Sequence, residues 1–222
     1  MGRPAELDRA RLGDELARGM QALGLEAPAG AEGRLLDYLE LLHRWNRTYN
    51  LTAVRDPAAM VVRHLLDSLV VVPHVHGRRV IDVGAGAGLP GIPLAILRPD
   101  ISVTLLDSNG KKTRFMAHAA RTLGLEGVEV VRTRLEDYHP EDCFDSVLSR
   151  AFATVRQMLD WGGHLACGSG KILAMKGKYP GDELGDIPDD YSLEAVHPLS
   201  VPGLDSERHL VVIRPLRTPG EH

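Results

Sequence analysis

The sequence of 222 residues has no uninterrupted apolar run near the roughly 18 residues that a membrane-spanning helix needs. It holds only two cysteines, which excludes a disulfide framework and a four-cysteine zinc site. Its beginning, MGRPAELDRARLGDEL, carries four acidic residues and no apolar run, so it does not resemble a signal peptide. These absences predict a protein of the cytoplasm whose cysteines are reduced.

An excess of positive charge is also absent. The chain has 26 lysines and arginines against 30 acidic residues, a net charge of −4 at pH 7. Nucleic-acid-binding domains commonly have a pI above about 9, whereas this sequence has a pI near 6.2. A nucleic-acid substrate would therefore have to be bound by a local cluster of cations.

The spacing of apolar residues divides the chain into a helical part and an alternating part. Up to about residue 76 the spacing is helical, and Asp56-Pro57 is a typical start for the last of three helices. From residue 79 short β-branched runs alternate with helical segments, as in a doubly wound, mostly parallel sheet. The predicted strands are 78–83, 101–107, 127–132, 145–150, 171–177, 191–199 and 207–215. No helix separates the last two, so they should pair antiparallel.

We therefore predict an α/β fold in which a Rossmann-like domain of seven strands, residues 77–216, follows a helical segment, residues 1–76. The tail, residues 217–222, should be disordered.

A glycine-rich loop follows the first predicted strand, in the segment VIDVGAGAGLPG. The carboxyl ends of parallel strands are where open α/β sheets bind ligands. Gly84, Gly86 and Gly88 would let the backbone turn tightly and approach such a ligand closely. The window from Gly86 to Gly91 fits the G-x-G-x-x-G pattern of dinucleotide sites, which is a weak signal by itself.

Two carboxylates distinguish between possible cofactors. Asp82, two residues before Gly84, would repel a pyrophosphate but suits the amino group and sulfonium of S-adenosylmethionine. Asp107, at the end of the second predicted strand, could accept hydrogen bonds from both ribose hydroxyls of either cofactor. Together they favour S-adenosylmethionine. The alternative for Asp82 is that it only caps a turn.

Residues 38–215 resemble the bacterial small-subunit ribosomal RNA guanine-N7 methyltransferases, also called the glucose-inhibited division protein B family. The resemblance lies in the segments WNRTYNLTAVRDP, RHLLDS, IDVGAGAGLPGIPLAILRPD, LLDSNGKK, SRAF, AMKG and SERHLVVI.

This resemblance implies a class I methyltransferase fold and methyl transfer to N7 of guanine 527 of 16S rRNA, near the decoding site. It links loss of activity to streptomycin resistance, and it leaves open whether naked rRNA or a small-subunit particle is the substrate. We expect a monomer. By resemblance, the cofactor contacts fall on Gly84, Leu89, Leu135, Glu136 and Arg150.

The chemistry of N7 agrees with the residues after the fourth predicted strand. Guanine N7 has a free lone pair and no proton to lose, so the enzyme has to position the reactants and needs no general base. The sequence has Ser-Arg-Ala-Phe there, ending in Phe152, instead of the Asn/Asp-Pro-Pro-aromatic loop that grips an exocyclic amine. No cysteine follows this strand, which argues against C5 methylation of a pyrimidine. Cys143 and Cys167, which we place before the strand and in a loop, should be ordinary thiols.

Several of these residues have two interpretations each. Arg150, our candidate for positioning in catalysis, could hold the methionine carboxylate or donate to guanine O6, or it could form a structural ion pair. Phe152 could stack on an extruded base or belong to the core. Leu135 would lie against the adenine with Glu136 beside it, although Glu136 could equally be a solvated surface residue.

Five cations are candidates for binding RNA phosphates: Arg44, Arg47, Lys176, Lys178 and Arg208. Such residues usually only solvate a surface.

Histidines suggest no metal site, and we expect no bound metal. His64 and Asp67 lie three residues apart on one predicted helix, where a structural pair is the favoured interpretation. His74 and His76 have no third ligand nearby and fit a turn.

Two other functions compete with this interpretation. A nicotinamide-dependent dehydrogenase would use Asp107 but leaves Asp82 without a role. An RNA-binding module with a vestigial cofactor site would not need the intact glycine loop.

Overall fold

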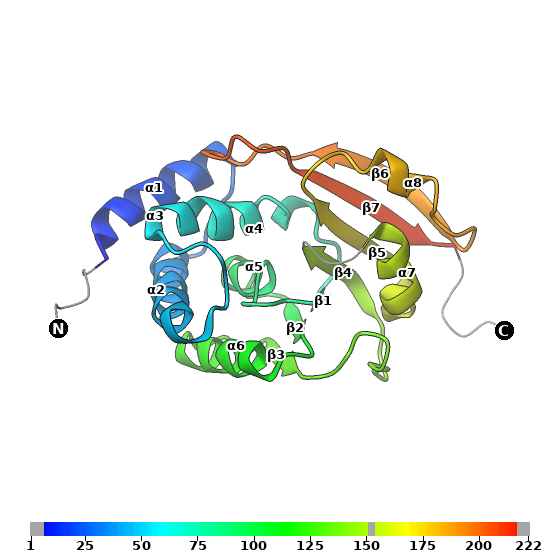
Figure 1. Ribbon diagram of the computed structural model, residues 1–222, viewed down its shortest axis with the longest axis horizontal. Helices are drawn as coiled ribbons and strands as arrows, with labels where there is room; N and C mark the ends of the chain where they lie inside the picture. The colour runs from blue at the N-terminus through cyan, green and yellow to red at the C-terminus, as the bar shows by residue number, and fades with distance from the viewer. Residues whose placement is uncertain (1–6, 151–153, 217–222) are drawn as a thin grey trace.

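The computed structural model describes residues 7–150 and 154–216. Within them a single sheet has the strand order β3-β2-β1-β4-β5-β7-β6 (Figure 1). The strands are β1 (Arg79–Val83), β2 (Ser102–Leu106), β3 (Val128–Val131), β4 (Phe144–Arg150), β5 (Ala166–Lys176), β6 (Tyr191–Pro198) and β7 (His209–Pro215). The first five strands pair in parallel, and β7 pairs antiparallel with both β5 and β6. This confirms the predicted fold class and the antiparallel end of the sheet.

The helices before the sheet and between its strands are mostly those that the sequence pattern predicts. They are α1 (Arg9–Ala22), α2 (Ala31–Tyr49), α3 (Pro57–Met60), α4 (Asp67–Leu69), α5 (Gly91–Leu97), α6 (Gly110–Thr122), α7 (Val155–Gly162) and α8 (Gly181–Leu184). A π-helical turn, η1 (Val61–Leu66), joins α3 to α4, and η2 (Val72–His74) and η3 (Gly163–Leu165) are 3-10 turns. No helix of the described ranges is long and apolar enough to cross a membrane.

The two faces of the sheet have different covers. Along β1, Val80 points into a core shared with α1, α2, α5 and α6, whereas Ile81 points to the opposite face, where α7 packs. This alternation follows from the strand period of two, and both faces are apolar because both are covered. The same core takes in Leu16 of α1 and Leu39 of α2, so the N-terminal helices are continuous with the packing of the sheet.

Sequence reasoning missed α7 and α8 and began the fifth strand too late. Thr154 caps α7 through a capping box with Gln157, and this pair of residues was the sequence signal for the start of the helix. The strand predicted at 171–177 begins five residues earlier, at Ala166, which pairs with Phe144 of β4. A register shift separates this pair from the next one, Ser146 with Lys171. The predicted disorder of residues 217–222 concerns residues outside the described ranges.

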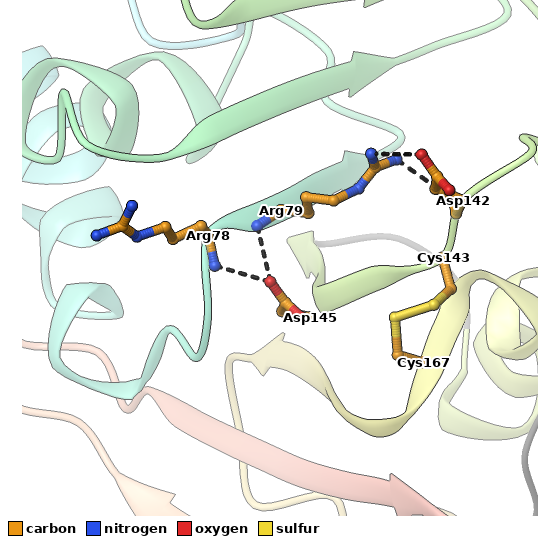
Figure 2. Close-up of a disulfide and its surroundings, with 6 residues drawn as sticks. All are labelled: Arg78, Arg79, Asp142, Cys143, Asp145 and Cys167. Carbon is orange, nitrogen blue, oxygen red and sulfur yellow. Dashed lines mark hydrogen bonds and ion pairs between the residues drawn. A yellow bond between two sulfur atoms is a disulfide. The ribbon is translucent and has the colours of Figure 1, made fainter.

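Our prediction that both cysteines are ordinary thiols is wrong in this structure, which joins Cys143 to Cys167 by a disulfide (Figure 2). Cys167 lies on β5 and not in a loop, and the pairing of Phe144 with Ala166 places the two cysteines side by side. The bond lies where β4 and β5 begin. Arg150 ends β4 at its other end, so the disulfide is remote from the carboxyl ends of the parallel strands, where open α/β sheets in general bind ligands.

Candidate functional site

A cavity of about 520 Å³ opens at the carboxyl ends of β1, β4 and β5. It joins the glycine loop to the helical segment and to the start of β7. Its lining residues are Leu51, Thr52, Val54, Arg63, His64, Asp67, Gly84, Ala85, Gly86, Ala87, Leu89, Lys112, Arg150, Met175, Lys176, Gly177 and Arg208. Of the predicted cofactor residues, Gly84, Gly86, Leu89 and Arg150 therefore share one cavity.

The glycine loop needs its glycines for two different reasons. Gly84, Gly86 and Gly88 all have left-handed backbone angles, with φ of 68°, 62° and 85°. A Cβ on Gly86 would meet nothing closer than 3.9 Å, so this glycine leaves open space on the cavity side. A Cβ on Gly88 would instead collide with Ile92 of α5. Gly86 is thus free to meet a ligand, whereas Gly88 lets the helix pack.

Asp82 lies beneath this loop and does not line the cavity. Its side chain is fully buried, and its Oδ2 accepts a hydrogen bond of 2.8 Å from the backbone N–H of Gly91, at the start of α5. The other oxygen, Oδ1, is buried and has no hydrogen-bond partner in the described structure. Burial raises the pKa of this carboxyl from 3.8 to about 7. The contact that the structure contains is thus the one expected if Asp82 caps a turn.

Asp107 supports the loop from the end of β2. Its Oδ2 accepts a hydrogen bond of 2.9 Å from the N–H of Gly86, and Oδ1 accepts one of 2.8 Å from the N–H of Asn109. The ammonium of Lys112 lies 3.6 Å from Oδ2. Each carboxylate oxygen can accept more than one hydrogen bond, so Asp107 keeps capacity for a ligand.

Arg150 ends β4 at the wall of the cavity. Its Nη1 donates to Oδ2 of Asp67 and to the backbone carbonyl of Arg63, both at 3.1 Å. The other oxygen of Asp67 accepts a hydrogen bond of 2.7 Å from Nε of Arg208. The structural ion pair considered for Arg150 is therefore present, and it lies in the wall of the candidate site.

His64 and Asp67 have separate partners in place of the expected pair. His64 Nε2 is 2.9 Å from the hydroxyl oxygen of Thr52, while Asp67 binds the two arginines. Burial, together with the charge of Arg150, lowers the pKa of His64 from 6.5 to about 4. The imidazole is therefore neutral at pH 7.

Leu135 and Glu136 do not line this cavity. Leu135 is buried in the core beneath α7, where a Cβ on Gly162 would touch it. Glu136 is exposed, and its carboxylate lies 3.5 Å from the guanidinium of Arg134. Phe152 falls among residues 151–153, outside the described ranges.

Comparison with known proteins decides the family. A family model described as rRNA small subunit methyltransferase G matches residues 32–211. The chain belongs to the rRNA small subunit methyltransferase G family. It is 50% identical to the ribosomal RNA small subunit methyltransferase G of Pseudomonas paraeruginosa over 202 residues, which cover 90% of this chain and 94% of that protein. The corresponding protein of Ectopseudomonas mendocina is 52% identical over 206 residues, 92% of this chain and 96% of the relative.

Solved structures confirm the class I methyltransferase fold. The glycopeptide N-methyltransferase MtfA, solved with S-adenosylhomocysteine, superposes with a TM-score of 0.57 at 11% identity, over 68% of this chain and 87% of its own. TrmN from Thermus thermophilus superposes with a TM-score of 0.55 at 18% identity, over 77% of this chain and 53% of its own.

In this member of the rRNA small subunit methyltransferase G family, the predicted RNA-binding cations are spread over the surface. Lys176 and Arg208 line the cavity, whereas the exposed Arg44, Arg47 and Lys178 do not. Lys176 also forms an ion pair of 2.8 Å with Glu183.

Sequence reasoning assigned no role in the site to three of its residues. Tyr38 of α2 is fully buried and donates a hydrogen bond of 2.7 Å to the carbonyl of Ala87 in the glycine loop. Lys112 of α6 lines the cavity, and Asp67 binds two arginines. The segments RHLLDS and LLDSNGKK contain Asp67 and Lys112, so the resemblance marked them without giving them a role.

Proposed function

We propose that this protein binds S-adenosylmethionine in the cavity and transfers its methyl group to N7 of guanine 527 of 16S rRNA. The observation that supports this most is that one cavity joins the left-handed glycine loop to a cationic wall. Among the described residues its lining contains five lysines and arginines, namely Arg63, Lys112, Arg150, Lys176 and Arg208, but only one carboxylate, that of Asp67. Such a cavity suits a substrate that carries phosphates.

The residues of the cavity fit this cofactor. The open space at Gly86 admits a ligand against the backbone, and Asp107 beside it can accept hydrogen bonds from ribose hydroxyls. Arg150 would hold the methionine carboxylate through its remaining N–H groups or donate to guanine O6. Asp82 acts from beneath the loop, by fixing the start of α5.

The remaining predicted cofactor residues act at the adenine. Leu135 and Glu136 follow β3, so their backbone and the loop that holds them would border the base. Arg44, Arg47, Lys178 and the two cavity cations, Lys176 and Arg208, would contact RNA phosphates.

The reaction needs alignment more than proton transfer. S-adenosylmethionine supplies a methyl group on a sulfonium. The lone pair of N7 forms the new N–CH3 bond as the S–CH3 bond breaks, and S-adenosylhomocysteine leaves. N7 has no proton to lose, so the neutral His64 in the wall is not required as a base. We propose that the protein acts as a monomer and without a metal.

A thermal-shift measurement with S-adenosylmethionine, S-adenosylhomocysteine and NAD tests the cofactor. We expect stabilisation by the first two and none by NAD, and stabilisation by NAD alone would favour the dehydrogenase. Gly86→Val should abolish the shift while circular dichroism stays near wild type, because a bulky β-branched side chain would strain a left-handed backbone and fill the open space.

Mapping of N7-methylguanosine tests the substrate. We expect loss of one such site in 16S rRNA from cells without the gene, restored by the wild-type gene and not by the Gly86→Val variant. Incubating the purified protein with naked 16S rRNA and with small-subunit particles then identifies the form that it methylates. An unchanged map would contradict the proposed function and favour an RNA-binding module.

A further inference from the structure

Asp67 is a buried carboxylate that binds two arginines of the cavity wall. Its side chain is 5% exposed, and its two oxygens are divided between the arginines, Oδ2 to Arg150 at 3.1 Å and Oδ1 to Arg208 at 2.7 Å. These arginines come from the end of β4 and from the loop before β7, which are 83 and 141 residues away in sequence. A buried carboxylate needs such partners, because an unpaired charge would be strongly disfavoured there.

The π-helical turn before Asp67 supplies a second acceptor for Arg150. In an α-helix the N–H of Asp67 would bind the carbonyl of Arg63, four residues earlier. Here it binds the carbonyl of Val62, five residues earlier. The Arg63 carbonyl instead accepts a hydrogen bond of 3.1 Å from Nη1 of Arg150. Turns of this kind are frequent at functional sites, and this one aims a carbonyl and a carboxylate at the same nitrogen.

Both guanidinium groups keep N–H groups for a ligand. Arg150 uses only Nη1 for its contacts with the described residues, which leaves Nε and Nη2. Arg208 uses Nε and Nη1, the latter with Ser206 and Glu207, which leaves Nη2. Asp67 therefore fixes the orientation of both groups without using up their capacity to donate.

We propose that Asp67 is a positioning residue that holds Arg150 and Arg208 in place together, so that one carboxylate serves both the cofactor and the RNA. This inference rests on the proposed function, in which Arg150 faces the cofactor and Arg208 faces a phosphate. Both oxygens of Asp67 are bound to the arginines, and the residue acts on the ligands through these two side chains.

Two measurements on Asp67→Asn test this role: the Kd of S-adenosylhomocysteine by calorimetry, and the KM for the rRNA substrate. We expect both constants to rise by about tenfold, the effect of losing about 1.4 kcal/mol of binding free energy. Asp67→Glu keeps the charge and should recover part of each loss. All constants are measured well below the unfolding temperature of each variant. If Asp67→Asn does not fold, the same comparisons are made with Asp67→Glu, whose smaller losses should depend on the two arginines in the same way.

Double-mutant cycles separate positioning from a general effect on the fold. In an Arg150→Ala background, Asp67→Asn should no longer change the Kd of S-adenosylhomocysteine but should still raise the KM for rRNA. In an Arg208→Ala background the pattern should be reversed. Losses that are additive in both cycles would overturn the proposal, because a damaged fold weakens each site whichever arginine is present.

Glu194 provides the matched control. It also binds two cations, Lys171 at 2.8 Å and Arg214 at 3.0 Å, and it does not line the cavity. Glu194→Gln should leave the Kd and the KM within about twofold of wild type. Equal losses in Glu194→Gln and Asp67→Asn would refute a specific role of Asp67. If the wild-type protein bound no S-adenosylhomocysteine, the proposed function would fail first.

Discussion

The buried carboxyl of Asp82 should make the protein less stable as the pH rises from about 4 to about 7. Burial raises its pKa in the folded state from 3.8 to about 7, so in this window the folded protein keeps a proton that the unfolded chain has released. Stability falls with pH wherever the folded state binds more protons. One pKa unit corresponds to 1.36 kcal/mol, so the contribution of Asp82 should fall by about 3 kcal/mol between about pH 4.5 and 7 and level off about one pH unit higher.

The assay compares the free energy of unfolding of the wild type with that of Asp82→Asn, by urea denaturation at a series of pH values. The asparagine oxygen can still accept the hydrogen bond from Gly91, so the variant loses mainly the titration. Burying the amide can add a fixed cost to the free energy of unfolding of the variant. This cost shifts the difference between the two proteins by the same amount at every pH and leaves its pH dependence unchanged. Wild type should lose stability relative to the variant up to about pH 7.

An exposed carboxyl with a shift of the opposite sign provides the control. The side-chain hydrogen bond from Arg98 lowers the pKa of Asp100 to about 2. Its contribution to stability is therefore lost only below about pH 4, and the difference between wild type and Asp100→Asn should be constant above that value. A difference between wild type and Asp82→Asn that is equally flat would refute the reasoning about Asp82.

Four further predictions concern other parts of the chain. The lowered pKa of His64, about 4, means that wild type should lose stability relative to His64→Gln as the pH falls from about 6.5 to 4, measured by urea denaturation. Reducing the disulfide between Cys143 and Cys167, which are separated by 24 residues, should cost about 3 kcal/mol, and the Cys143→Ser variant should no longer respond to reductant. Gly88→Ala should lower the melting temperature more than Gly86→Ala, because only at Gly88 does the new Cβ collide with a neighbour. Lys178→Ala should flatten the plot of log RNA affinity against log salt by about 0.7–0.9 and leave the affinity for S-adenosylhomocysteine unchanged.

Local patterns were sufficient for the fold class and for the approximate positions of most strands. The strands β1, β2, β4 and β7 alternate apolar side chains between two covered faces, and the glycine loop directly follows β1. The alternation of apolar residues predicted the strands, and the cluster of glycines predicted the loop. The fifth strand was misplaced because its first residues, Ala166 to Gly170, carry few apolar side chains, and its start is marked by the pairing of Ala166 with Phe144 of β4. The pairing of strands across the sheet cannot be read from a local stretch of about ten residues of sequence.

Local sequence patterns could place a residue near the cavity only where it lies in the glycine loop or at the end of a predicted strand. The loop from Gly84 to Leu89 and the strand-end Arg150 lie where strand ends predict them. The contacts of Asp67 with Arg150 and Arg208 could not be predicted in this way, because even Arg150 is 83 residues away in sequence and local spacing favoured His64 as the partner. The disulfide escaped for the same reason. Its two cysteines are brought together by neighbouring strands, while composition alone argued for free thiols.

The acidic net charge and the proposed RNA substrate are compatible because the relevant field is local. At physiological salt, exposed charges act over about 8 Å, so acidic groups elsewhere on the surface have little effect at the cavity. At the cavity itself the lining cations outnumber the single carboxylate, and that carboxylate is bound to two of them. The protein should therefore attract RNA weakly at long range and bind it through a few oriented contacts. Under these conditions the orientation of each arginine matters more than the number of positive charges, which is why a buried acid such as Asp67 can favour the binding of an anion.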